Sequence, residues 1–178
     1  VVQVVKVYLG EPLPAPDPDR VAILTGSWDM VTDKLPWSEY TAQWIRDAVD
    51  QGMPLFGVCY GHQLMAHALG GRVDYHPQGR EMGCLDIRVT TQGHTDPFTA
   101  GLSQGFQAYL THFQTVIQPP TGAEVLASSA HDKHQIIRYG KQAISTQFHP
   151  EITAEIATSL IDLAHQKLLD EGRDPQEM

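Results

Sequence analysis

A cysteine stands between two glycines at the end of an apolar run, in the stretch Gly57-Val58-Cys59-Tyr60-Gly61. This pattern is typical of a sharp turn from a strand into a helix that carries a nucleophile at its centre. Side chains on either side of such a strained turn would clash, and glycines remove those clashes. The helix N-terminus directs free N–H groups at the sulfur, which favours a thiolate with a lowered pKa. An isolated motif of this length is equally typical of a buried, inert cysteine.

A histidine and a carboxylate lie close together near the end of the chain, in Phe148-His149-Pro150-Glu151. Alternation along 142–148 predicts a strand that ends with His149 on the face opposite Phe148. Pro150 favours extended backbone at His149, so the Glu151 carboxylate can approach and orient the imidazole. Taken alone, the two residues are better interpreted as a polar strand end and a carboxylate in the first turn of a final helix.

A third segment, Thr25-Gly26-Ser27, follows another short apolar strand. A glycine-containing loop at this edge of the sheet could offer one backbone N–H to an oxyanion, and Tyr60 could offer the other. A plain turn between a strand and a helix explains the segment equally well. Together, the three segments predict a Cys–His–Glu arrangement for nucleophilic acyl transfer.

The segments that must position these residues alternate between strand and helix through the first part of the chain. We predict strands at 1–9, 21–25 and 53–58, the second of them buried, and helices at 37–51 and 62–69. Four prolines make residues 10–20 a loop. This alternation indicates a parallel sheet with covering helices.

The second half of the chain contains short strand-like segments separated by turns, at 72–76, 81–90, 105–113, 123–129, 134–140 and 142–148. The tight connection at 138–142 requires an antiparallel pair. A helical period returns from 151 to 171. We therefore predict a single α/β domain over residues 1–178, with a mostly parallel, mixed central sheet flanked by helices.

Composition excludes several classes of function. The formal net charge is −9, and the 12 Lys and Arg residues are scattered, so we expect no nucleic-acid partner. No apolar stretch is long enough to cross a bilayer, so we expect no membrane partner. Two cysteines fit a reducing compartment, which favours a cytoplasmic location. His131 and His134 lack companion ligands at metal spacing and are interpreted as loop surface, and we expect neither a metal nor a cofactor.

The motifs Gly-Val-Cys-Tyr-Gly-His-Gln and Phe-His-Pro-Glu, with the upstream Thr-Gly-Ser loop, resemble the class I (triad) glutamine amidotransferases, which have a flavodoxin-like fold. The likeness is greatest to the glutaminase domain of GMP synthase and its stand-alone relatives, over about residues 1–152. It implies that Cys59 forms a γ-glutamyl thioester, that His149 is the general base and acid, and that Glu151 orients it. It also implies an oxyanion hole made by backbone N–H groups of Tyr60 and the Gly26–Ser27 loop.

The resemblance extends to a substrate pocket. Gln63 matches a position that helps to hold the glutamyl part of the substrate, and Glu81 matches one near its α-amino group. The backbone of Thr111-His112-Phe113 matches a segment that lines the pocket. His62 and His67 are interpreted as structural, because both fall on the short helix that follows Cys59.

The sequence departs from the family pattern in two ways. Complete members begin with a strand and a helix before the segment that matches residues 1–12, so we expect the first strand–helix unit to be missing. No synthetase module follows, so a glutaminase of this kind would pass ammonia to a separate synthetase subunit.

Two other functions stay open: a stand-alone hydrolase of γ-glutamyl peptides with the same triad, and a binding or regulatory module without turnover. Relatives that act as intracellular proteases are a further alternative, but the placement of His149 and Glu151 directly after a strand argues against them.

Overall fold

The strands and helices predicted from residue 21 onward are present in the predicted order, but the short helix Thr91–Thr95 and the strand Gln114–Gln118 were not predicted from the sequence. The computed structural model describes residues 1–172 and 174–175. The strands are β1 (Ala22–Leu24), β2 (Leu55–Val58), β3 (Arg72–Tyr75), β4 (Glu81–Val89), β5 (Gly105–His112), β6 (Gln114–Gln118), β7 (Glu124–Ser128), β8 (Ile136–Arg138) and β9 (Ala143–Thr146). The α-helices are α1 (Pro36–Asp50), α2 (Tyr60–Ala68), α3 (Thr91–Thr95) and α4 (Ala154–Asp170), and short 3-10 helices lie at Val7–Leu9 and Val31–Asp33.

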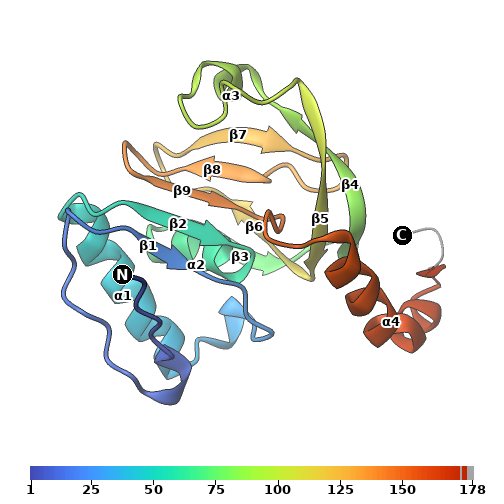
Figure 1. Ribbon diagram of the computed structural model, residues 1–178, viewed down its shortest axis with the longest axis horizontal. Helices are drawn as coiled ribbons and strands as arrows, with labels where there is room; N and C mark the ends of the chain where they lie inside the picture. Colours follow the sequence, from blue (N-terminus) through green and yellow to red (C-terminus); the bar gives the residue numbers. More distant parts are fainter. Residues whose placement is uncertain (173, 176–178) are drawn as a thin grey trace.

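The central sheet is mixed and flanked by helices, as predicted, and it curls strongly (Figure 1). Its strand order is β1-β2-β9-β8-β7-β4-β5, and β3 pairs with β6 in a separate ribbon. Parallel pairing is confined to β1–β2 and β2–β9, whereas the other neighbours in the central sheet are antiparallel. The parallel part is smaller than expected, because strand–helix alternation stops after α2 and short turns can join only antiparallel strands. The antiparallel β8–β9 pair confirms the tight connection predicted there.

The predicted strand at residues 1–9 is wrong. This segment pairs with no strand in the described residues, and its only regular part is the 3-10 helix Val7–Leu9. β-branched composition favours a strand only where a pleated, half-buried surface is available to pack against, and Val1, Val2 and Val4 are exposed. The expectation that the strand at 21–25 is buried is also wrong, because β1 lies at the sheet edge and leaves Ile23 exposed.

Two apolar clusters hold the elements that support the site. In the first, α1 and α2 pack against β2 through Ile45, Leu64 and Leu55, all buried. In the second, Ile87, Leu126 and Ile136 pack together on the curled part of the sheet. The helix α4 lies outside the sheet beside β5 and β4 (Figure 1). No helix in the described part of the chain is both long and apolar enough to cross a membrane.

Candidate functional site

The turn between β2 and α2 carries Cys59 in a backbone conformation that non-glycine residues rarely adopt, with φ 52° and ψ −102°. A Cβ on Gly57 would lie 2.7 Å from the carbonyl oxygen of Gly61. A Cβ on Gly61 would lie 2.3 Å from the carbonyl oxygen of Leu24 in β1. Both approaches are closer than a carbon atom tolerates, so the glycines let α2 start directly against β1 and β2.

Replacing Gly61 with alanine is expected to lower the free energy of unfolding by about 1–3 kcal/mol, because the new methyl group overpacks the turn. Gly101→Ala is the matched control, since a Cβ at Gly101 meets no atom within 4 Å. Urea unfolding of both variants tests this. Equal stability of the two variants would contradict the tight packing of the turn.

His149 follows β9, the strand that pairs in parallel with β2. Its backbone N–H donates to the Tyr109 carbonyl at 2.9 Å, and its Nδ1 lies 2.7 Å from a carboxylate oxygen of Glu151. If Gly26 carried a Cβ, that atom would lie 3.4 Å from Cε1 of His149 and 3.8 Å from Cβ of Cys59. Residues that follow β1, β2 and β9 therefore meet at one edge of the sheet, where open α/β folds place ligands.

Hydrogen bonding orients the His149 ring. A carboxylate only accepts, so Nδ1 carries the proton in the bond to Glu151. Nε2 is buried and has no hydrogen-bond partner among the described residues, Cys59 included. Glu151 precedes α4, which begins at Ala154 with Thr153 as its N-cap, so the expectation that Glu151 lies in the first helical turn is wrong.

The thiol of Cys59 differs from the sequence-based expectation. Burial raises the pKa of Cys59 to about 12; a hydrogen bond from the Tyr60 backbone lowers it, and the nearby Glu151 charge raises it further. The expected low pKa is therefore wrong, because the cost of desolvating the thiolate exceeds the stabilisation from the helix N-terminus. The resting sulfur is a neutral thiol, and it also lies 3.9 Å from the carbonyl oxygen of Thr111.

A pocket of about 380 Å³ opens in front of the sulfur. The predicted site residues in its wall are Ser27, Cys59, Tyr60, Gln63, Thr111, His112 and Phe113. Gly26, His149 and Glu151 do not line this pocket, and Gly26 lies against Cys59 and His149. The side-chain amide N–H groups of Gln63 donate within the protein, to the carbonyl oxygen of Gln114 at 2.6 Å and to Oε1 of Gln147 at 3.0 Å.

The family model described as glutamine amidotransferase class-I matches residues 4–162. The chain belongs to the class-I glutamine amidotransferases. A GMP synthase [glutamine-hydrolyzing] of Desulfotalea psychrophila is 32% identical over 143 residues, which cover 79% of this chain and 26% of that protein. One of the subunits of a GMP synthase [glutamine-hydrolyzing] from Saccharolobus solfataricus is 37% identical over 101 residues, 56% of this chain and 52% of that protein. The chain thus spans about a quarter to about a half of these two relatives.

Solved structures support the same family fold. The crystal structure of a glutamine amidotransferase from Thermotoga maritima superposes with a TM-score of 0.81 at 24% identity, covering 97% of this chain and 74% of that one. A glutamine amidotransferase from Methylobacillus flagellatus gives a TM-score of 0.79 at 28% identity, covering 93% and 66%. The predicted amidotransferase-like α/β fold is confirmed.

Glu81 does not line the pocket of this amidotransferase. Its carboxylate is buried behind the wall and bonded to His112, Ser129 and Gln135. The expected place of Glu81 near the α-amino group of a substrate stays a prediction, and its neighbour His112 is the member of this pair that lines the pocket.

Sequence reasoning missed the other wall residues, which come from segments far apart in the chain: Trp28, Asp29, Met30, Arg80, Met82, Gln114, Leu160, Leu163, Ala164 and Lys167. It also missed Gln147, which holds Gln63. Strand alternation could have found it, since Gln147 and His149 are two residues apart.

The other histidines have structural contacts. His62 is fully buried, its Nδ1 lies 2.8 Å from Oγ of Ser145, and burial lowers its pKa to about 3. His67 pairs with Glu39 at 2.9 Å, so both fit the predicted structural role. His131 and His134, interpreted as loop surface, do lie in a loop, but both are half-buried, and His134 bonds to the Val116 carbonyl through Nδ1. Asp132 between them is buried.

The raised pKa of Cys59 predicts how the thiol reacts in this family member. Below about pH 10 the thiolate fraction should grow roughly tenfold per pH unit, because the pKa lies above this range. In a Cys84→Ala background, alkylation of Cys59 by iodoacetamide is therefore expected to accelerate from about pH 7 to about pH 10 without a plateau. A rate that levels off below pH 7 would show a stable thiolate and contradict this assignment.

Proposed function

We propose that the chain is a glutaminase-type cysteine hydrolase that converts glutamine to glutamate and ammonia. The observation that carries this proposal is the position of His149. One ring nitrogen is bonded to Glu151, and the other is buried and unpartnered among the described residues. The ring and Cys59 both pack against Gly26. This is the order of groups that nucleophilic acyl transfer needs.

Acylation begins from the neutral thiol. As the sulfur of Cys59 attacks the amide carbon of glutamine, its proton passes to Nε2 of His149, and Glu151 stabilises the resulting imidazolium. The amide oxygen becomes an oxyanion that accepts hydrogen bonds from backbone N–H groups of Tyr60 and the Gly26–Ser27 loop. The oxygen of Gln63 is available to hold the α-ammonium group, because the amide N–H groups of Gln63 are already used.

Release and hydrolysis use the same proton carrier. The imidazolium of His149 gives its proton to the amide nitrogen, and the C–N bond breaks. Ammonia is released, and a γ-glutamyl thioester remains on Cys59. Water then gives a proton to His149 and attacks the thioester carbon. The C–S bond breaks, the thiol regains its proton, and glutamate leaves.

A second candidate is the hydrolysis of a larger γ-glutamyl amide or peptide. The pocket of about 380 Å³ lies within the roughly 300–1,000 Å³ range of pockets that hold drug-sized ligands. Its rim includes Trp28, which is 80% exposed, and Leu163 of α4, so an apolar leaving group would find a surface to contact.

The ammonia needs an acceptor if glutamine is the substrate. We propose that this acceptor belongs to a separate synthetase subunit. The S. solfataricus relative is named as one subunit of a GMP synthase, which supports such an arrangement. A non-catalytic binding module is the third candidate, and the convergence of Cys59, His149 and Glu151 counts against it.

Release of glutamate from glutamine and from a panel of γ-glutamyl dipeptides separates these functions. Faster release from glutamine, with one ammonia per glutamate, is the expected result. Faster release from the dipeptides would establish the second candidate and replace the first. No release from any substrate, together with no labelling of Cys59 by a glutamine analogue carrying a chloroketone, would contradict both and leave the binding module.

A further inference from the structure

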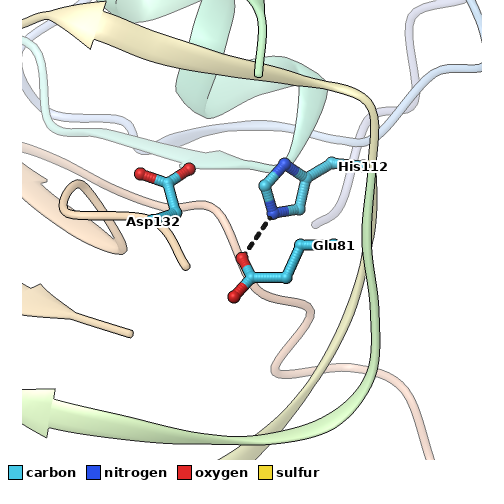
Figure 2. A group of neighbouring side chains, drawn as sticks. All are labelled: Glu81, His112 and Asp132. Carbon is cyan, nitrogen blue, oxygen red and sulfur yellow. Dashed lines mark hydrogen bonds and ion pairs between the residues drawn. The ribbon is translucent and has the colours of Figure 1, made fainter. Parts of the chain in front are cut away.

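A group of buried ionisable side chains lies directly behind the pocket wall. Figure 2 shows Glu81 and His112 side by side, with Asp132 across from them. One ligand-type atom from each lies within 4.8 Å of the other two, a spacing that would suit a metal ion. The hydrogen bonds of the three residues indicate a different purpose.

Both nitrogens of the His112 ring face acceptors. Nδ1 lies 2.9 Å from the carbonyl oxygen of Gln114, and Nε2 lies 2.8 Å from Oε2 of Glu81. A neutral imidazole carries only one N–H, so it cannot donate to a carbonyl and a carboxylate at once. An imidazolium carries two N–H groups and can donate both to the Gln114 carbonyl and to an ionised Glu81.

The surroundings of Glu81 favour the ionised form. Ser129 donates to Oε1 at 2.6 Å, and Gln135 donates to Oε2 at 2.8 Å. Burial acts to raise the pKa of Glu81, but the hydrogen bonds from His112 and Ser129 outweigh it, so the pKa lies below its usual value. The Glu81 and His112 side chains are both only 2% exposed, so they form a buried ion pair.

Asp132 joins this network through its backbone N–H, which donates to the Ser129 hydroxyl at 2.8 Å, and both of its carboxylate oxygens accept hydrogen bonds. Its Oδ1 accepts the backbone N–H of His134 at 2.9 Å, and its Oδ2 accepts the hydroxyl of Thr115. All three members of the group are thus already held by protein donors and acceptors.

The ion pair bears on the site through the chain segment that contains His112. The next residue toward the N-terminus, Thr111, has its carbonyl oxygen 3.9 Å from the sulfur of Cys59. The carbonyl oxygen of Gln114 accepts both from His112 and from the amide of Gln63. The segment from Thr111 to Gln114 therefore contacts the nucleophile and its helix at two points, and Glu81 anchors it from the neighbouring strand.

We propose that Glu81 and His112 are positioning residues of the pocket. They hold the carbonyl oxygen of Thr111 beside the sulfur of Cys59, and that of Gln114 where the amide of Gln63 donates to it. Glu81 itself does not contact the substrate amide. This role rests on the proposed glutaminase function, whereas the charge state of the pair does not depend on it. A 1 Å misplacement in an active site can cost about 100-fold, so the effect on kcat/KM should be large.

The test compares three variants of the full chain with glutamine as substrate. Glu81→Ala is expected to lower kcat/KM by about 10- to 100-fold, mainly through KM, because the segment that holds Gln63 shifts. Glu81→Gln should recover at least part of the loss, since an amide can still bond to the ring. Asp86→Asn, which removes an exposed carboxylate from the same strand, is the matched control and should leave both constants unchanged.

A spectroscopic measurement keeps the proposal open to refutation if a variant fails to fold or glutaminase activity is absent. ¹⁵N NMR of the wild-type His112 ring at pH 7 should show two protonated nitrogens, and Glu81→Gln should show one. A bare nitrogen in the wild type would overturn the ion pair. Kinetics of Glu81→Ala that match Asp86→Asn would overturn the positioning role. A stoichiometric zinc ion that survives dialysis, and is lost in Asp132→Asn, would also overturn it in favour of a metal site.

Discussion

Cys59→Ala is expected to lower kcat for glutamate release by about 10⁴-fold or more, since loss of a nucleophile removes the covalent route. Alanine cannot form the thioester, and no other thiol lines the pocket in the described part of the chain. The substitution removes only one sulfur atom from a buried position, so we expect the fold to persist. Initial rates of ammonia and glutamate release measure the effect.

The second cysteine provides the control for this prediction. Cys84 lies in β4, is partly buried and does not line the pocket. Cys84→Ala should therefore keep kcat within about twofold of the wild type, as is usual for substitutions away from a site. Equal losses in the two variants would mean that the loss reflects folding and not the nucleophile.

His149→Ala is expected to lower kcat by about 10³- to 10⁴-fold at pH 7, the upper range for loss of a general base. The reason is the raised pKa of the thiol, about 12, which leaves almost no thiolate at neutral pH without a base. The residual rate should rise roughly tenfold per pH unit up to about pH 10, because hydroxide then replaces the imidazole. Rates measured from pH 6 to pH 10 test both statements.

Glu151→Gln is expected to lower kcat less than His149→Ala does. Its carboxylate is 57% exposed, so solvent can replace part of its support for the imidazolium. We expect a loss of about 10- to 100-fold, smaller than that of His149→Ala or Cys59→Ala. Equal losses in all three variants would mean that Glu151 does more than orient the ring.

Local sequence patterns predicted the turn that carries Cys59 and the contact between His149 and Glu151. Gly57 and Gly61 mark the turn because their neighbours leave no room for a Cβ, and this need is visible as residue spacing. His149 and Glu151 are two residues apart, so a short stretch of sequence fixes their contact. The type of most of the main elements, helix or strand, and their order along the chain followed from apolar periodicity in the same way.

Nonlocal pairing decided what the sequence could not predict. The contact of Glu81 with His112 depends on the register of β4 with β5, which pairs residues far apart in the chain. Residues 1–9 have the composition of a strand but pair with no strand in the described part of the chain. Asp132 lies in a polar segment typical of a surface loop, but the residues around it bury its side chain. The low pKa expected for Cys59 failed because burial is a property of the whole fold.

Rapid acid quenching during turnover of glutamine, followed by peptide mass mapping, detects the proposed covalent intermediate directly. A γ-glutamyl thioester is expected on the peptide that contains Cys59, and hydroxylamine should remove it. Steady turnover with that peptide unmodified, or with the glutamyl group on another residue, would contradict this expectation.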